Sequence, residues 1–155
     1  MPSFVVQEHH SRRLHWDFRL EVAGTLKSWA VPKGPSLDPH ERRFAIRTPD
    51  HSLGWAKFEG EIPAGSYGAG EVVLWDEGEY HPLKPQDPEE GLRKGILIFR
   101  MSGHRLKGVF ALVKLRGVPK KDAWILIKKC DVFARTGWRI PILSDGFQTR
   151  LKKAA

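Results

Sequence analysis

The chain has 155 residues, enough for one domain with a sizeable buried core. Its 26 Lys and Arg residues against 18 acidic ones give a net charge of +8, which favours a polyanionic partner such as nucleic acid over a membrane. A single cysteine, Cys130, excludes an internal disulfide and indicates a reducing compartment. No apolar run approaches the ~20 residues of a membrane span, and the start of the chain lacks a signal-peptide pattern. We therefore expect a cytoplasmic protein.

Short runs of alternating apolar and polar residues, separated by turn residues, recur along most of the chain and predict strands. The predicted strands cover residues 4–7, 15–22, 26–31, 43–47, 55–61, 71–75, 79–80, 96–101, 109–115 and 124–128. A turn is predicted at Asp76-Glu77-Gly78. This spacing is typical of an all-β fold, and we predict a small closed or partly open β-barrel with one or two short helices.

Residues 87–94 carry the helical signals: Asp87 at the N-cap, Pro88 at the first helical position and Gly95 as the stop. Beyond Trp138 the alternating pattern fades, and residues 150–155 form a basic end. We predict a single β-barrel domain over residues 1–140 and a C-terminal basic segment over residues 141–155.

The segment QEHHSRRLHWDFRLE, residues 7–21, carries the main functional signal. From His15 it alternates strictly, with period two, so that one parity faces the core and the other faces outward. The apolar parity is Trp16, Phe18, Leu20 and Val22, and the polar parity is His15, Asp17, Arg19 and Glu21. Such a polar row, beside His9 and His10, is unusual for a solvated strand, although a polar barrel face with hydrogen-bonded histidines is the alternative.

Two imidazoles and one carboxylate form a three-point ligand set that suits manganese, iron(II) or zinc and leaves coordination sites open. His15 and Asp17 project the same way from a strand, and His9 can fold back onto them through a loop over residues 11–13. Arg19 could hold a phosphate with two hydrogen bonds, and Glu21 could fix an imidazole tautomer.

Other residues bear on phosphate binding, each with an ordinary surface role as the alternative. Lys33 lies in a Pro-Lys-Gly-Pro turn, and His51 follows Pro-Asp in a predicted loop. Arg43 and Arg47 share one strand parity and could face the same phosphates. The segment GSYGAG, residues 65–70, could line a site through its backbone amides, but no helix follows it, so it is not a P-loop.

Four stretches carry a family resemblance: HHSRRLHWDFRLE, SWAVPKGPSLDP, RRFAIRTPDHSLGWAKFEGEIP and GSYGAGEVVLWDEGEY. Together they resemble the 3′-phosphoesterase domain of bacterial and archaeal DNA ligase D, which also occurs as a free-standing protein. The resemblance is dense over residues 4–80 and looser toward Asp131. It implies a manganese-dependent hydrolase of DNA double-strand break repair by non-homologous end joining. Such an enzyme removes a 3′-terminal ribonucleoside and then the remaining 3′-phosphate, leaving a 3′-hydroxyl for ligation.

The resemblance also implies residue roles. The metal ligands would be His9, His15 and Asp17, with Mn²⁺ bound and Co²⁺ or Zn²⁺ as other occupants; the spacing to His15 selects His9 over His10. The catalytic residues would be Arg19, Glu21, Arg43 and His51, with His51 as either a general acid or a phosphate ligand. The substrate would contact Lys33, Arg43, His51 and Trp55. The family typically has a tyrosine at the Trp55 position, and an indole can stack but can neither accept a hydrogen bond nor ionise as a phenol does.

The implied partners are a DNA primer-template with a 3′-ribonucleotide or 3′-phosphate end, a DNA ligase and other end-joining proteins. The short segment before the first motif and the short end of the chain favour a free-standing protein. Two other classes stay open at this stage. One is a non-catalytic, basic β-barrel that binds nucleic acid, for which the six tryptophans could supply stacking. The other is a cupin-like iron oxygenase that uses a His-x-Asp pair.

Overall fold

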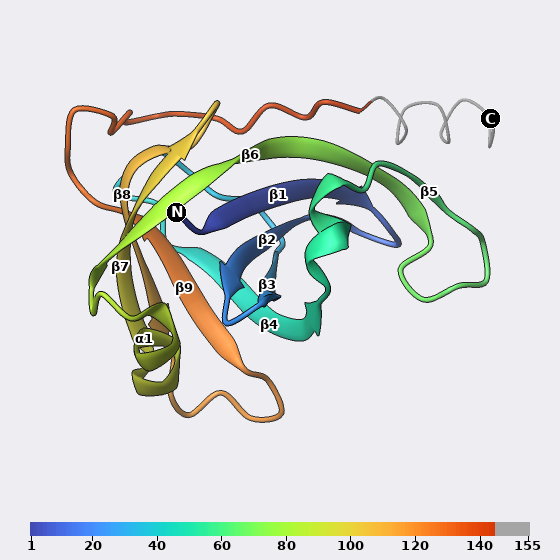
Figure 1. Ribbon diagram of the computed structural model, residues 1–155. Coiled ribbons are helices and arrows are strands. Elements are labelled where there is room, and N and C mark those ends of the chain that lie inside the picture. Colours follow the sequence, from blue (N-terminus) through green and yellow to red (C-terminus); the bar gives the residue numbers. More distant parts are fainter. Residues whose placement is uncertain (145–155) are drawn as a thin grey trace.

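The computed structural model, which describes residues 1–144, is a closed antiparallel barrel of eight strands with a ninth strand at one edge (Figure 1). The predicted basic end, residues 150–155, lies outside the described residues. The elements are β1 (Ser3–His10), β2 (Leu14–Val22), β3 (Thr25–Val31), β4 (Arg43–His51), the 3₁₀-helix η1 (Leu53–Lys57), β5 (Gly60–Ile62), β6 (Gly70–Lys84), α1 (Pro88–Lys94), β7 (Ile96–Gly103), β8 (Lys107–Lys114) and β9 (Ala123–Lys128).

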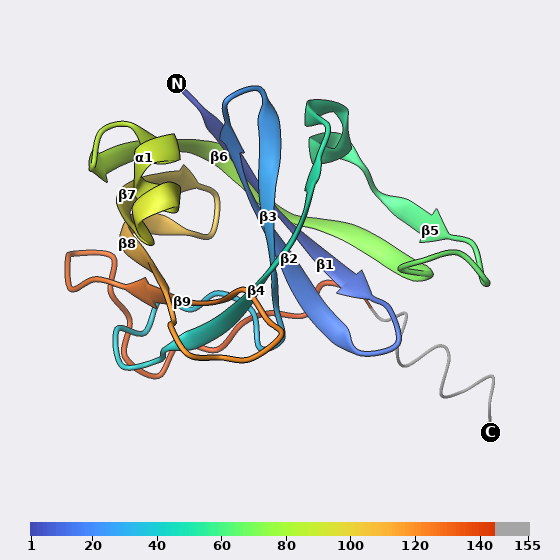
Figure 2. The ribbon, with the colours of Figure 1, turned by 90° about the horizontal axis from the view of Figure 1, so that it is seen from below.

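The strand order is β1-β2-β3-β4-β9-β8-β7-β6-β5, and a further pairing between β1 and β6 closes the barrel. The strand outside the closed barrel is β5, which pairs with the first part of β6, where Gly60 lies opposite Val72. It therefore extends outward from the barrel, at the end of the molecule opposite α1 (Figure 2). The prediction of a closed or partly open all-β barrel is confirmed.

The barrel interior is filled by aromatic and aliphatic side chains from every barrel strand. Phe18 of β2 packs between Trp29 and Phe99, with ring centroids 6.2 Å from each. Burying each such side chain contributes roughly 1.5–3 kcal/mol. Because β2 alternates, this inward packing fixes Asp17 and Arg19 on the outer face, as the sequence predicts.

The prediction of a strand over residues 55–61 is wrong for the first half of that range, where η1 forms instead. The reason is the pair Trp55 and Phe58, whose rings stack with centroids 4.4 Å apart and planes 9° apart. Residues three apart lie on one side of a 3₁₀ turn, whereas in a strand they point to opposite faces. Gln7 holds this turn against the barrel, since its Nε2 atom donates to the carbonyls of Trp55 and Phe58.

The turn predicted at Asp76-Glu77-Gly78 is also wrong, because β6 runs through these residues. All three pair regularly with β1, and the nearby register shift falls at Trp75, because Val6 pairs with Asp76 and Gln7 with Leu74. The Asp76 carboxylate accepts hydrogen bonds from the backbone amides of Glu77, His104 and Leu106, which bonds β6 to the turn between β7 and β8.

The predicted helix is confirmed as α1. Asp87 caps it by accepting a hydrogen bond from the Glu89 amide at 3.0 Å, and Gly95 ends it with a left-handed φ of 89°. Among the helices of residues 1–144, none is long and apolar enough to cross a membrane.

After β9 the chain returns along the β1–β6 side of the barrel as the C-terminal strap, residues 135–144 (Figure 1). Trp75 Nε1 donates to the Pro141 carbonyl at 2.9 Å. The buried Glu8 carboxylate accepts from the amides of Leu143 and Ser144 at 2.7 and 2.8 Å. Residues 141–144 are thus bonded to the barrel, and the predicted boundary at residue 140 stays a prediction.

Candidate metal centre

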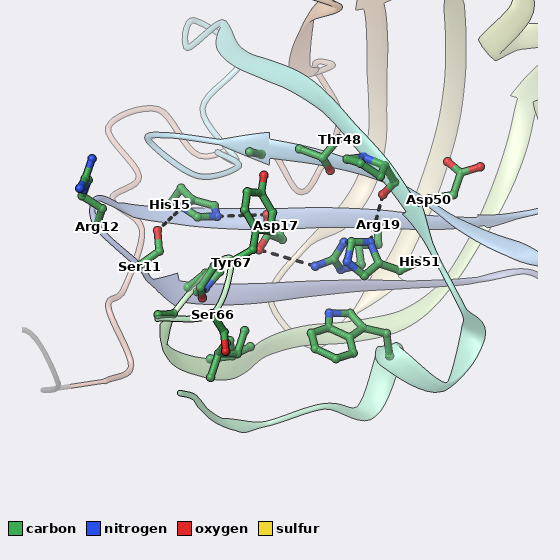
Figure 3. Close-up of a pocket in the computed structure, with 18 residues that line it drawn as sticks. Ser11, Arg12, His15, Asp17, Arg19, Thr48, Asp50, His51, Ser66 and Tyr67 are labelled. Atoms are coloured by element: carbon green, nitrogen blue, oxygen red, sulfur yellow. Dashed lines mark hydrogen bonds and ion pairs between the residues drawn. The ribbon is translucent and has the colours of Figure 1, made fainter. Parts of the chain in front are cut away.

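A cleft of about 1160 Å³ lies over the outer face of β1, β2, β3 and β4. One wall is η1, and the other is the loop between β5 and β6, residues 63–69 (the β5–β6 loop). Figure 3 shows His15, Asp17, Arg19 and His51 following one another along the cleft, with Ser66 and Tyr67 on the loop beside them. Polar side chains that a flat sheet would expose are therefore enclosed.

Three predicted metal ligands meet in this cleft. The turn over residues 11–13 folds β1 back on β2, so that His9 lies directly opposite His15 in the register. One ligand atom from each of His9, His15 and Asp17 lies within 4.8 Å of the others. His9 Nδ1 is 3.1 Å from Asp17 Oδ2, and His15 Nε2 is 3.1 Å from Asp17 Oδ1.

The second nitrogen of each histidine faces a backbone carbonyl. His9 Nε2 is 2.6 Å from the Gly68 oxygen, and His15 Nδ1 is 3.1 Å from the Arg13 oxygen. Metal-binding histidines commonly donate their other N–H to such a carbonyl, which turns the ligating nitrogen toward the ion. Two imidazole nitrogens and a carboxylate converge here, so the residues fit a divalent transition metal.

The charges of the three residues are coupled. Burial alone would raise the pKa of Asp17, but hydrogen bonds from His15 and His9 and the Arg19 charge hold that pKa well below its usual range. Burial lowers the pKa of His15, but the hydrogen bond and charge of Asp17 and the Arg13 carbonyl outweigh it, so this pKa is raised. Asp17 is therefore a carboxylate at neutral pH, as a metal ligand must be.

Arg19 lies next to the three ligands and is only 4% exposed. Its Nε atom donates to Gln7 Oε1 at 2.7 Å and its Nη1 atom to Ser28 Oγ at 2.8 Å. Its Nη2 atom is 3.6 Å from Asp17 Oδ2. The guanidinium is thus held rigidly at the floor of the cleft.

His51, the last residue of β4, meets Arg19 from the facing side. Its Nδ1 atom is 3.0 Å from both Arg19 Nη1 and the Pro49 oxygen. A guanidinium only donates and a carbonyl only accepts, so Nδ1 serves one of them, and the charged donor makes the stronger bond. Burial and then the Arg19 charge lower the pKa of His51. The ring is therefore neutral at pH 7, with its proton on Nε2.

Trp55 completes this end of the cleft, with its ring centroid 5.5 Å from that of His51.

Sequence reasoning missed Gln7, whose side chain bonds both Arg19 and η1. The sequence feature that could have identified Gln7 is the strand parity that it shares with His9. The residues 65–70 do line the site, through Ser66, Tyr67, Gly68 and Ala69. Tyr67 is 98% exposed at the rim.

Three predicted site residues do not line the cleft. Glu21 accepts hydrogen bonds from the amide and hydroxyl of Ser3, at 2.9 and 3.0 Å. Lys33 is exposed in the turn after β3. Arg43 is the first residue of β4 and His51 is the last, eight residues further along. At a strand's usual rise per residue this separates them by about 26 Å. Arg43 lines a separate groove of about 450 Å³.

The barrel and its cleft define a β-barrel domain with a candidate metal-ligand set beside a buried arginine. A sequence model of the DNA ligase D 3′-phosphoesterase domain matches residues 7–114. Over 142 residues, 92% of the chain, it is 49% identical to the multifunctional non-homologous end joining protein LigD of Pseudomonas aeruginosa. Over 123 residues, 79% of the chain, it is 46% identical to LigD of Mycobacterium tuberculosis. The chain belongs to the DNA ligase D 3′-phosphoesterase domain family, and it spans 17% and 15% of these two relatives.

Proposed function

We propose that the domain is a metal-dependent hydrolase that heals DNA 3′ ends in non-homologous end joining. It removes a 3′-terminal ribonucleoside and then hydrolyses the 3′-phosphate, leaving a 3′-hydroxyl for a DNA ligase. Family membership supports the reaction class. The observation that carries the proposal is the meeting of a three-residue ligand set with two phosphate-suited donors, Arg19 and His51, in one cleft.

His9, His15 and Asp17 would hold the ion, which we propose to be Mn²⁺, with Co²⁺ or Zn²⁺ as other occupants. A bound divalent ion supplies Lewis-acid catalysis at a phosphate. The protein contributes an oriented ligand set, since a backbone carbonyl faces the second nitrogen of each imidazole.

Arg19 stabilises the charge that develops on the phosphoryl oxygens. It needs no rearrangement to do so, because Gln7 and Ser28 already fix the guanidinium. Fixed donors in an enclosed site are worth far more than mobile ones in water.

His51 is a phosphate ligand rather than a general acid in this proposal. A general acid must carry a transferable proton at working pH, but the lowered pKa keeps the ring neutral. Its Nε2–H is the group left to donate to a phosphoryl oxygen, because Nδ1 is engaged by Arg19.

The substrate would be a primer-template with a 3′-ribonucleotide or 3′-phosphate end. Trp55 lines the cleft beside His51, where it would contact the terminal base or sugar, and the net charge of +8 attracts the DNA backbone. Glu21, Lys33 and Arg43 lie outside the cleft, so any contribution they make acts through the fold or through DNA beyond the reacting phosphate.

The test is an end-trimming assay on a primer-template that carries one 3′-terminal ribonucleotide. Wild type, His15→Ala and the matched control His81→Ala, which changes an exposed histidine on β6, are each incubated with Mn²⁺, Zn²⁺, Mg²⁺ or a chelator. We expect shortening to a 3′-phosphate and then a 3′-hydroxyl, dependent on metal and His15 and unchanged in the control. If the duplex binds but neither product forms with any metal, a nucleic-acid-binding barrel is the better account.

A further inference from the structure

The β5–β6 loop reaches the candidate metal centre through one residue, Gly68. Its carbonyl oxygen lies 2.6 Å from His9 Nε2, although the two residues are 59 positions apart in the chain. Gly68 has a φ of +75°, and a Cβ atom there would lie 3.3 Å from His9 Cε1. The loop backbone is therefore packed directly against the His9 ring.

The two metal-site histidines differ in how their orientation is fixed. The carbonyl that faces His15 belongs to Arg13, two residues away in the same hairpin. This contact forms wherever β1 and β2 form. The carbonyl that faces His9 comes from a loop that follows the edge strand β5. Of the two imidazoles, only His9 depends on that loop.

The Gly68 contact also selects which His9 nitrogen can bind a metal. A carbonyl oxygen only accepts, so a ring hydrogen-bonded to it carries a proton on Nε2. The other nitrogen, Nδ1, lies 3.1 Å from Asp17 Oδ2 and would give up the proton that it donates to that carboxylate when it binds an ion. Without the loop, no acceptor at Nε2 would favour the tautomer that is protonated on Nε2. The alternative tautomer is protonated on Nδ1, and it cannot bind an ion through Nδ1.

We propose that the Gly68 carbonyl is a positioning group of the metal centre, which makes Nδ1 the ligand atom of His9 and links metal affinity to the position of the β5–β6 loop. The inference rests on the metal site of the proposed function. Linkage is reciprocal, so a bound ion also holds the loop in place. Since Ser66 and Tyr67 of the same loop form a cleft wall, the metal helps to shape the wall that meets the substrate.

The first test compares two glycine variants by Mn²⁺ titration, with free Mn²⁺ followed by electron paramagnetic resonance. Gly68→Ala presses a methyl group against His9 and strains a positive φ. Gly65→Ala imposes the same backbone strain in the same loop, at φ +90°, with no neighbour within 4 Å. We expect Gly68→Ala to weaken Mn²⁺ binding about tenfold or more, the usual effect of disturbing a group that orients a ligand. Gly65→Ala should bind as wild type does, and equal effects of the two variants would overturn the proposal.

The second test needs no variant. Nitrogen-15 spectra of the imidazole rings in the Zn²⁺-loaded wild type report which nitrogen carries the proton. We expect His9 to be protonated on Nε2 and His15 on Nδ1, and ligation of His9 through Nε2 would overturn the proposal. If Mn²⁺ and Zn²⁺ bind and require His15 but the His9 tautomer is reversed, only this inference fails. If neither ion binds wild type, the proposed function fails with it.

Discussion

At the scale of single residues, the Arg19 side chain is buried and held by several hydrogen bonds. Its guanidinium contacts Gln7, Ser28 and His51 at once, which a lysine ammonium on a single stem cannot do. We predict that Arg19→Lys lowers kcat/KM for 3′-phosphate hydrolysis by about 100-fold or more, the usual effect of removing a fixed transition-state donor. Mn²⁺ affinity should persist, since Arg19 is not a ligand.

The control for this prediction is Arg12→Lys, at the exposed rim of the same cleft. This variant keeps the charge where no fixed geometry is needed, so its kcat/KM should stay close to that of wild type. An Arg19→Lys enzyme with normal kcat/KM would show that the buried guanidinium serves the fold and not the reaction.

The second residue-scale prediction concerns the protonation of His51. Burial first, and then the Arg19 charge, lower the pKa of His51 below its ordinary value of 6.5. The ring is therefore neutral at pH 7, and it gains a proton on Nδ1, losing the hydrogen bond from Arg19, only as the pH falls through this lowered pKa. We predict that Arg19→Gln raises the pKa, measured by nuclear magnetic resonance titration of the metal-free protein.

Asp50→Asn is the matched control for that titration. The Asp50 charge raises the pKa of His51, so its removal should shift the titration in the opposite direction, to lower pH. Shifts of the same sign in both variants would mean that the change reflects altered burial of the ring rather than the charge of Arg19.

The residues that the sequence could predict are those whose placement is local. His15, Asp17 and Arg19 share a strand face because side chains alternate, and His9 joins them through a short hairpin. Gln7 and Gly68 gain their contacts only when η1 and the β5–β6 loop fold over the sheet, which no short-range pattern encodes. The placement of Arg43 is the opposite case: it shares β4 with His51, but it lies at the other end of that strand and lines a separate groove.

At the scale of elements, Gln7 links three parts of the site. Its side chain is fully buried, donates to the carbonyls of Trp55 in η1 and of Phe58 just after it, and accepts from Arg19. We predict that Gln7→Leu lowers the free energy of unfolding by about 2–3 kcal/mol, because it leaves the buried Arg19 Nε donor without its partner and removes the hydrogen bonds to the Trp55 and Phe58 carbonyls. Urea denaturation measures this, and the end-trimming rate should fall with it because Arg19 loses its fixed position.

The matched control is Gln86→Leu, an exposed glutamine before α1. Its side chain lies in solvent, so the free energy of unfolding should change by no more than about 0.5 kcal/mol. Equal losses in the two variants would mean that Gln7 contributes through its volume and not through its hydrogen bonds.

The sequence predicts the wrong element where one local pattern is compatible with two structures. Trp55 and Phe58 belong to a mixed polar and apolar run that suits a strand or a single helical turn, and the stacking of their rings decides for the turn. The Asp-Glu-Gly triplet at residues 76–78 is typical of a turn, yet it pairs with β1 inside a long strand, and Asp76 uses its carboxylate to bond the turn between β7 and β8. There, contacts with segments far away in the sequence override the local signal.

At the scale of the whole molecule, regular strand spacing predicts the fold class but not the closure of the barrel. Closure depends on β1 pairing with β6, across some seventy residues of sequence. It also depends on β9, which joins β4 to β8 and lies beyond the matched family segment that ends at residue 114. The C-terminal strap then packs against the reverse face of β1, where Glu8 lies between Gln7 and His9.

The last prediction concerns this strap. Truncation after Arg139 removes the amides of Leu143 and Ser144 from the buried Glu8 carboxylate, and removes the Pro141 carbonyl from Trp75 Nε1. Glu8 keeps His10 Nε2 as a partner at 2.7 Å, but a buried carboxylate that loses two backbone hydrogen bonds costs about 1–3 kcal/mol, so urea denaturation should show a loss of about this size. Truncation after Ser144 keeps all three bonds, so the difference in free energy of unfolding between the two truncations isolates these bonds and their segment. Because Glu8 adjoins His9, the protein truncated after Arg139 should also bind Mn²⁺ more weakly. Equal stability and equal Mn²⁺ affinity of the two truncated proteins would show that the strap does not support the site.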